Sequence, residues 1–273
     1  MRASAVVSSR ALRVTAGLGC AATLALLAAA AAPQHAHAAA GSTPDLTGQW
    51  ARYPGFARTP PDPKLVPAPP GKLLLKPAYA GPYEKRRAEE RESDLKGEPI
   101  AAPGTDCLPY GMPEMMSAIY PLEILQTPGQ VTIIAEAMSQ VRRIFLGKPQ
   151  LKMGEAAPSF YGHSVGHWEG DTLVVDTIGV KESVLGHSEM PHSDQMRITE
   201  RFRLVTPDIL HDEITVSDPV VLEKPWTFTF GYRRLQNYEM LEYVCENNHE
   251  YVDDQGVTHV RLQDAPASPP AKP

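Results

Sequence analysis

Three histidines and two carboxylates supply the residue types of an acid–base site. They are His163, His167, His192, Asp176 and Glu200. An imidazole titrates near neutral pH, and a carboxylate hydrogen-bonded to it fixes its tautomer and orientation. These residues predict non-redox chemistry of the lyase, isomerase or hydrolase type.

The two carboxylates stand out because each alternates with apolar residues. Glu200 shares one side of its segment with Met196, Ile198, Phe202 and Leu204, and Asp176 shares one with Val174 and Ile178. A carboxylate on an apolar face is expected to be buried, so it needs a partner or a raised pKa. We predict Arg143 as the cation that neutralises either one. A purely structural ion pair is the alternative for Glu200.

The same histidines allow a mononuclear metal site as an alternative. In a straight strand the Cα atoms of His163 and His167 lie roughly 13 Å apart, whereas an imidazole nitrogen binds zinc at about 2.0–2.1 Å. A bulge at Gly162 or Gly166 would shorten the gap, and His192 would complete the set. A single divalent metal ion is therefore an open alternative, and no other cofactor is favoured.

An aromatic face follows further along the chain. Trp226, Phe228, Phe230 and Tyr232 alternate with polar residues, a pattern typical of barrel core. A barrel of about eight strands can also enclose one small ligand. We predict Trp226, Phe228 and Tyr232, with Arg143 and Trp168, as contacts for a small apolar or aromatic molecule. A non-catalytic small-ligand carrier is therefore the alternative to an enzyme.

Several familiar chemistries lack their motifs in this sequence. It contains no Gly-x-Ser-x-Gly nucleophile elbow, no glycine-rich phosphate loop and no His-Glu-x-x-His zinc helix. The three cysteines have no spacing typical of zinc or haem attachment.

The elements that must position these residues are short strands. Alternating segments are separated by turn residues such as those of 127–130, 169–171 and 206–208. This spacing predicts a mainly β fold, an antiparallel up-and-down meander closed into a barrel or strongly curved sheet. We expect the barrel domain over 120–250, with strands at 120–124, 131–136, 141–146, 163–168, 172–178, 196–204, 210–216, 226–232 and 240–246.

The segment 39–119 is expected to wrap around this domain. Prolines crowd residues 60–70 and exclude regular structure there. Residues 82–96 interleave Glu with Lys and Arg, which predicts a solvated surface helix, and a short helical turn is expected at 113–116. Residues 251–273 are expected to form a C-terminal tail.

The first 38 residues predict a cleavable signal peptide. Arg2, Arg10 and Arg13 precede an apolar run at 18–32, and Ala36-His37-Ala38 fits the peptidase site. We therefore expect a periplasmic or secreted protein. The leader contains no acidic residue, so its removal makes the chain more acidic than its net charge of −6. Such a chain has no electrostatic reason to bind nucleic acid, and no later stretch predicts membrane insertion.

Export also changes the interpretation of the cysteines. Cys107 and Cys245 remain after cleavage, and an oxidising compartment favours a disulfide between them. Its long loop would stabilise the fold by about 4–5 kcal/mol on the loop-entropy model. Two separate buried thiols are the alternative. The oligomeric state is not indicated.

The stretch 162–177, GHSVGHWEGDTLVVDT, resembles the core motif of a widespread family of exported bacterial proteins. Further similar features are Asp45-Leu46-Thr47-Gly48-Gln49-Trp50, Cys107-Leu108-Pro109, Gln126-Thr127-Pro128-Gly129, Pro191-His192-Ser193 and Glu242-Tyr243-Val244-Cys245-Glu246. The resemblance implies export but no activity and no catalytic residue. The opening Gly-x-Trp before a strand meander is similar to lipocalins, which implies a lipocalin-like barrel.

Overall fold

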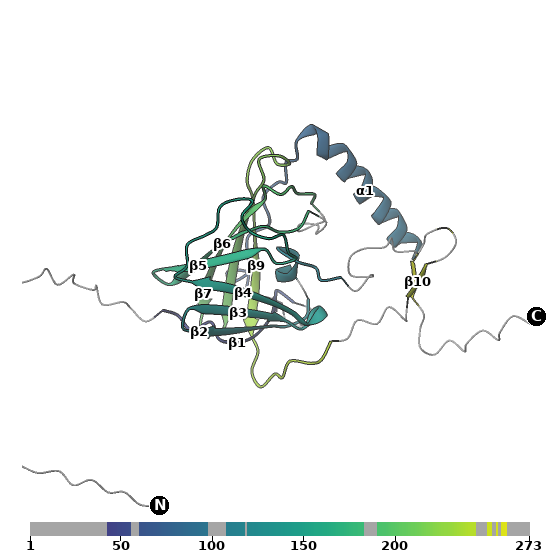
Figure 1. Ribbon diagram of the computed structural model, residues 1–273. Coiled ribbons are helices and arrows are strands. Elements are labelled where there is room, and N and C mark those ends of the chain that lie inside the picture. The colour runs from purple at the N-terminus through teal and green to yellow at the C-terminus, as the bar shows by residue number, and fades with distance from the viewer. Residues whose placement is uncertain are drawn as a thin grey trace, which may run out of the picture. The chain divides into compact units, whose positions relative to one another are not determined.

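Nine strands form a closed barrel, as predicted from the spacing of turns and alternating segments (Figure 1). The computed structural model describes residues 43–55, 60–97, 108–117, 119–182, 190–243, 250–252, 255 and 258–260. The barrel strands are β1 Gly48–Tyr53, β2 Leu122–Thr127, β3 Gln130–Ala135, β4 Gln140–Leu146, β5 His163–Glu169, β6 Thr172–Ile178, β7 Arg197–Thr206, β8 Ile209–Ser217 and β9 Trp226–Arg234.

The meander has one parallel junction, between β4 and β5, where only antiparallel pairs were expected. The other neighbouring pairs run antiparallel, and β9 closes onto β1. A parallel pair cannot be joined by a hairpin, so the chain between Leu146 and His163 must return to the starting end of the barrel. This connection is held to the sheet through a bridge between Ser159 and Val180.

The prediction of a last strand at 240–246 is wrong for residues 240–243, which are the ones that the structure describes. Residues 240–243 form no strand, and the ninth strand is β1, which comes from the segment expected to wrap the barrel. β1 pairs with both β2 and β9, so it occupies the edge that a strand at 240–246 would have needed. Trp50 of β1 is fully buried, and its indole nitrogen donates to the Leu46 carbonyl at 3.0 Å.

The interior of the barrel holds the main core. Inward positions alternate along the strands, as in β8, where Leu210, Ile214 and Val216 are buried. The 3-10 helix η1 (Glu114–Ser117) contributes Met115 and Met116 to this core. The Tyr232 hydroxyl donates to the Met116 carbonyl at 2.6 Å, which ties η1 to β9.

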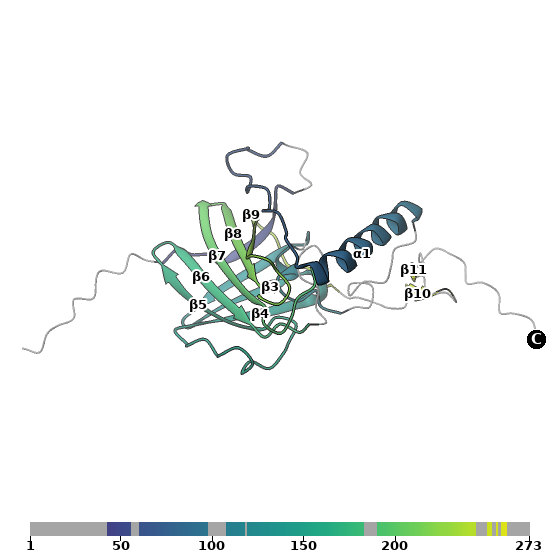
Figure 2. The ribbon, with the colours of Figure 1, turned by 90° about the horizontal axis from the view of Figure 1, so that it is seen from above.

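The remaining elements are short or peripheral to the barrel sheet. α1 (Pro77–Lys96), labelled in Figure 2, begins earlier than predicted. Ion pairs such as Arg86–Glu90 at 2.8 Å stabilise it. A second 3-10 turn, η2, spans Ala137–Ser139. In the expected tail, β10 (Glu250–Val252) pairs with β11 (Thr258–Val260). Of the helices in the described ranges, none has the length and apolar character to cross a membrane.

Some sequence-based predictions fall outside the described residues. They are the signal peptide at 1–38 and the disulfide between Cys107 and Cys245. These stay predictions.

The outer face of β9 has one position that requires glycine. A Cβ atom at Gly231 would lie 2.4 Å from the Tyr53 carbonyl oxygen and 3.0 Å from Pro67 Cγ. We expect Gly231→Ala to lower the free energy of unfolding by about 1–3 kcal/mol, because the backbone of β1 must move. Urea unfolding measures this. Gly81→Ala in α1, where the added Cβ meets nothing within 4 Å, is the control and should leave stability unchanged or raised. Equal effects of the two changes would contradict this close approach.

Candidate functional site

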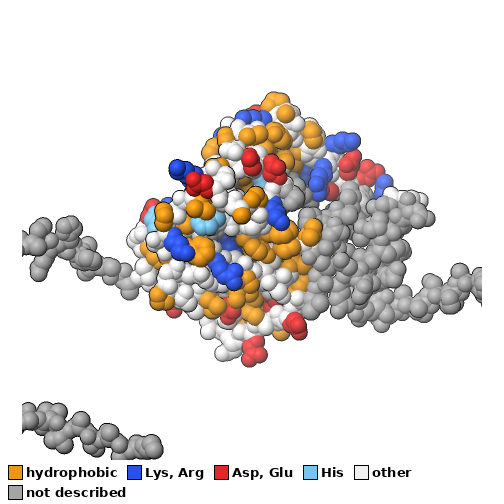
Figure 3. Space-filling model, in the orientation of Figure 1, with side chains coloured by type: hydrophobic (Ala, Val, Ile, Leu, Met, Phe, Trp, Pro, Cys, Tyr) orange, Lys and Arg blue, Asp and Glu red, His pale blue; other side chains and the backbone are white. Residues whose placement is uncertain are grey.

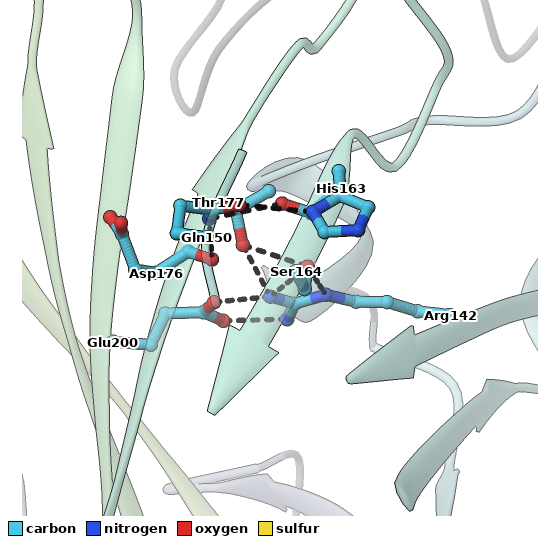
Figure 4. Close-up of polar contacts among 7 residues, drawn as sticks. All are labelled: Arg142, Gln150, His163, Ser164, Asp176, Thr177 and Glu200. Carbon is cyan, nitrogen blue, oxygen red and sulfur yellow. Dashed lines mark hydrogen bonds and ion pairs between the residues drawn. The ribbon is translucent and has the colours of Figure 1, made fainter. Parts of the chain in front are cut away.

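Glu200 lies on the inner face of β7 and is fully buried, as its alternation with apolar residues predicts. Its partner is Arg142 of β4, whose Nη1 donates to Glu200 Oε1 at 2.7 Å and whose Nη2 contacts Oε2 (Figure 4). The predicted pairing of Glu200 with Arg143 is therefore wrong. Arg143 is one position further along β4, and a shift of one residue places a side chain on the opposite face. Arg143 is exposed.

Two hydroxyl groups complete the contacts of Arg142. Its Nη2 donates to Thr177 Oγ1 at 3.0 Å, and its Nε donates to Ser164 Oγ at 3.3 Å. Ser164 and Thr177 are 2.8 Å from one another. The guanidinium, the carboxylate and both hydroxyls are buried and hydrogen-bonded, so this network is satisfied within the protein.

The outer face of the sheet carries His163, His167 and Asp176. His163 Nδ1 lies 2.9 Å from Gln150 Oε1, and Gln150 Nε2 donates to the Asp176 carbonyl at 2.7 Å. The Asp176 carboxylate pairs with Arg197 at 3.1 Å. Because adjacent residues in a strand face opposite sides, His163 and inward-facing Ser164 lie on opposite faces of β5. Figure 4 shows the imidazole apart from the Arg142–Glu200 contact.

His167 lies further along the same outer face, and its side chain is 66% exposed. Its Nε2 is 3.2 Å from Glu169 Oε1, while Arg201 donates to Glu169 Oε2 at 3.0 Å. These hydrogen bonds, from His167 first and Arg201 second, lower the pKa of the Glu169 carboxyl. Histidine side chains are visible at the surface over β5 (Figure 3).

His192 has different surroundings from the other two histidines. It is buried, and its Nδ1 donates to the Ser193 carbonyl at 3.0 Å. Its Nε2 is buried without a hydrogen-bond partner in the described structure. Asp218 accepts from the Ser193 backbone N–H at 2.6 Å and from its hydroxyl at 2.9 Å, so this carboxylate orients Ser193.

The predicted catalytic residues therefore do not share one face of the sheet. Glu200 points into the barrel, whereas His163, His167 and Asp176 lie outside, and no described contact joins His192 to any of them. In the part of the chain that the structure describes, no three His, Cys, Asp or Glu side chains are grouped closely enough to hold a metal ion.

The predicted ligand contacts other than Arg143 lie on the inner face. Trp226, Phe228 and Tyr232 are buried in β9, and Trp168 of β5 packs against the core while remaining partly exposed. The ring centroids of Trp226 and Phe228 are 4.7 Å apart, and those of Phe228 and Phe230 are 5.3 Å apart. They form a continuous aromatic surface along one strand.

Asp212 and Arg52 are buried polar residues that the sequence analysis did not select. Asp212 lies on the inner face of β8 opposite Phe230, and neither of its carboxyl oxygens has a hydrogen-bond partner in the described structure. Arg52 of β1 lies with its guanidinium carbon 4.3 Å from the Phe230 ring centroid. Its Nη1 is likewise buried and unpartnered in that structure. Both groups thus adjoin Phe230.

The surroundings of Asp212 favour its neutral form. Burial, followed by the charge of Glu200, raises the pKa of Asp212 well above its usual range, and Arg142 and Arg52 oppose this only in part. Burial raises the pKa of Tyr232 well above its usual range. The sequence did contain a signal that Asp212 is buried. Asp212 shares one face of its strand with the apolar residues Leu210, Ile214 and Val216, as Glu200 does with its own apolar neighbours.

Comparison with known proteins adds no identification. No protein-family model matches the chain, and no curated protein is significantly similar to it. The resemblance to exported bacterial proteins stays a prediction, and the function must be argued from the geometry.

We predict that separating Arg142 from Glu200 costs more than removing both. Glu200→Leu leaves a buried guanidinium unpaired and should lower the free energy of unfolding by about 3–5 kcal/mol. The double variant Arg142→Met/Glu200→Leu should regain most of that loss. Chemical denaturation of both variants tests this, with Glu213→Leu on exposed β8 surface as a control that changes stability by about 0.5 kcal/mol or less. A double variant as unstable as the single would contradict the pairing.

The buried Asp212 gives a pH-dependent prediction. The pKa of Asp212 in the folded protein lies above the value of about 3.9 in the unfolded chain. The contribution of Asp212 to the free energy of unfolding is therefore fully present below about pH 4, and it is lost as pH rises through the folded pKa. Asp212→Asn removes this loss. The unfolding free energy of the variant, relative to wild type, should therefore increase from about pH 4 to about pH 8.

Urea unfolding at several pH values measures this difference. Asp208→Asn, in an exposed turn, is the matched control and should follow wild type throughout. A difference between Asp212→Asn and wild type that stays constant with pH, or that decreases as pH rises, would refute the neutral buried carboxyl.

Proposed function

We propose that the protein is an exported barrel that binds a small apolar or aromatic molecule in its interior. In this proposal the polar end of the ligand meets Arg52 and Asp212, and its apolar body lies against the aromatic side chains of β9. Its periplasmic or secreted location rests on the predicted signal peptide, and its role is that of a carrier.

The observation that supports the proposal most is the pair of unpartnered polar groups inside the barrel. Buried polar atoms are nearly always hydrogen-bonded, and leaving one unsatisfied costs about 1–3 kcal/mol. Here two carboxyl oxygens of Asp212 and Nη1 of Arg52 lack partners in the described structure. A ligand with a carboxylate can accept from Arg52 Nη1 and also from the O–H group of neutral Asp212, which would give a partner to each of these two donors.

The neighbouring residues suit such a ligand. Phe230 adjoins both polar groups, and Phe228 and Trp226 extend the aromatic surface beyond it. Arg52 is only partly buried, so its side chain links the interior to solvent. An aromatic carboxylate has both the apolar body and the charged end that this arrangement requires.

Binding is favoured over the predicted acid–base catalysis for a geometric reason. A catalytic histidine must reach the reacting atoms together with its carboxylate. His163 and His167 lie on the outer face of β5, while Glu200 is already bound by Arg142 on the inner face. The interior thus provides recognition groups without an adjacent imidazole among the described contacts.

Naphthoate, an aromatic carboxylate, is the probe for this proposal. We expect saturable binding by calorimetry, weakened about tenfold by Arg52→Gln because a hydrogen bond to a charged group contributes about 1.5–3 kcal/mol. Phe228→Ala should also weaken binding. Arg143→Gln, which removes an exposed arginine from the outer face, is the matched control and should bind as wild type does.

Native mass spectrometry of the protein from its own host provides an independent test. We expect an added small-molecule mass that Arg52→Gln reduces. If naphthoate shows no saturable binding and the native mass equals that of the polypeptide alone, the carrier proposal fails and bound water is the partner of Asp212. Thermal unfolding of each variant checks that it remains folded.

A further inference from the structure

A concave site lies on the outside of the barrel, separate from the interior groups. It is a pocket of about 400 Å³ between the proline-rich segment and the outer faces of β6 to β9. We call it the outer groove, and its lining residues are Pro67, Ala68, Thr172, Arg201, Arg203, His211, Glu213 and Thr229. Its volume is in the range of small-molecule sites.

The floor of the outer groove is set by strand register. Thr172, Arg203 and His211 are directly opposite one another on β6, β7 and β8. Arg201, Glu213 and Thr229 form the neighbouring row on β7, β8 and β9. Adjacent strands are about 4.8 Å apart and same-face neighbours within a strand are about 6.7 Å apart. The two rows therefore present polar side chains over an area comparable with one sugar ring.

The wall of the outer groove is fixed in place by the sheet. His211 Nε2 lies 2.9 Å from the Leu65 carbonyl oxygen, and Gly71 donates from its backbone N–H to the Thr227 carbonyl at 3.0 Å. The Trp226 indole donates back to the Gly71 carbonyl at 2.6 Å. Pro67 packs against the bare face of Gly231. Hydrogen bonds to the sheet therefore hold the backbone in place on both sides of Pro67, at Leu65 and at Gly71.

Positive charge exceeds negative charge in this groove. Arg203 is exposed and makes no ion pair in the described structure, and Arg201 shares the Glu169 carboxylate at 3.0 Å. Glu213 is the one carboxylate among the lining residues. This local excess occurs on a chain whose net charge is −6, so it is not a consequence of overall composition.

From these observations we infer that the outer groove binds a small hydroxylated organic anion, with its carboxylate or phosphate on Arg203 and its hydroxyls on Glu213, Thr172 and Thr229. An arginine fork matches the oxygens of a carboxylate or phosphate. Glu213 can only accept hydrogen bonds when ionised, so it selects a ligand that also carries O–H donors. Sugar acids and sugar phosphates share this chemistry.

The lining residues discriminate against other ligand classes. No Phe, Tyr or Trp is among the described residues that line the groove, so an aromatic carboxylate finds no large aromatic surface there. Inorganic phosphate lacks a hydroxylated body and faces repulsion from Glu213 without compensation. The outer groove therefore differs in specificity from the interior site, and its binding does not depend on that site.

Calorimetry with glucuronate and with glucose phosphate tests the inference, with glucose and inorganic phosphate as comparison probes. We expect saturable binding of at least one of the two sugar anions, and its affinity should exceed that of glucose and of inorganic phosphate by about tenfold or more. Which anion binds more tightly distinguishes carboxylate from phosphate recognition. Rising salt should weaken binding, because exposed charges are screened.

Variants locate the bound anion. Arg203→Gln should weaken binding of the preferred sugar anion about tenfold, Arg203→Lys should restore part of it, and Arg143→Gln should change nothing. Arg203→Gln should leave naphthoate binding unchanged, which separates this site from the interior. The inference is overturned if neither sugar anion saturates at millimolar concentration, if inorganic phosphate binds as well as they do, or if Arg203→Gln and Arg143→Gln have equal effects.

Discussion

The buried contact between Arg142 and Glu200 spans the one parallel junction of the barrel, where the backbone ladder is short. The parallel junction of β4 and β5 rests on three residue pairs, whereas β7 and β8 share a long antiparallel ladder. Arg142 comes from β4, and its partners Ser164, Thr177 and Glu200 come from β5, β6 and β7. The side chains thus cross the parallel junction and connect four consecutive strands. Because all of these polar groups are satisfied, the network reinforces the sheet without a ligand.

The same sheet separates two kinds of polar chemistry by face. Inward positions hold few charged groups, and each has a strong electrostatic effect because water is excluded, as the raised pKa of Asp212 illustrates. Outward positions hold many charges of both signs, spread between apolar side chains (Figure 3). The barrel wall therefore keeps imidazoles and interior carboxylates apart, even where they are adjacent in sequence. This separation is the reason that a recognition role accounts for the arrangement better than acid–base catalysis does.

Much of the fold could be predicted from the sequence because alternation and turn residues are local signals. They identified eight of the barrel strands, and they placed Glu200 and the aromatic residues of β9 on buried faces. They could not reveal the parallel junction or the role of β1, because both depend on contacts between distant segments. The predicted partner of Glu200 was wrong by one position. Arg142 and Arg143 have identical side chains, and they differ only in which face of β4 each side chain occupies. Asp212 obeyed the same alternation rule, but its importance depends on Arg52 from a strand far away in sequence.

The closure of β9 onto β1 also has a consequence for the order of folding. β1 spans residues 48–53 and β9 spans 226–234, so the earliest strand of the barrel finds its last neighbour only after nearly the whole chain exists. Contacts of such high sequence separation slow folding, because the loop entropy is lost before the contact forms. A chain emerging N-terminus first keeps Trp50 without its final neighbours until β9 arrives. Completion of the core is thus coupled to the synthesis of β9, and a chain truncated before β9 would keep an open sheet with two unpaired edges.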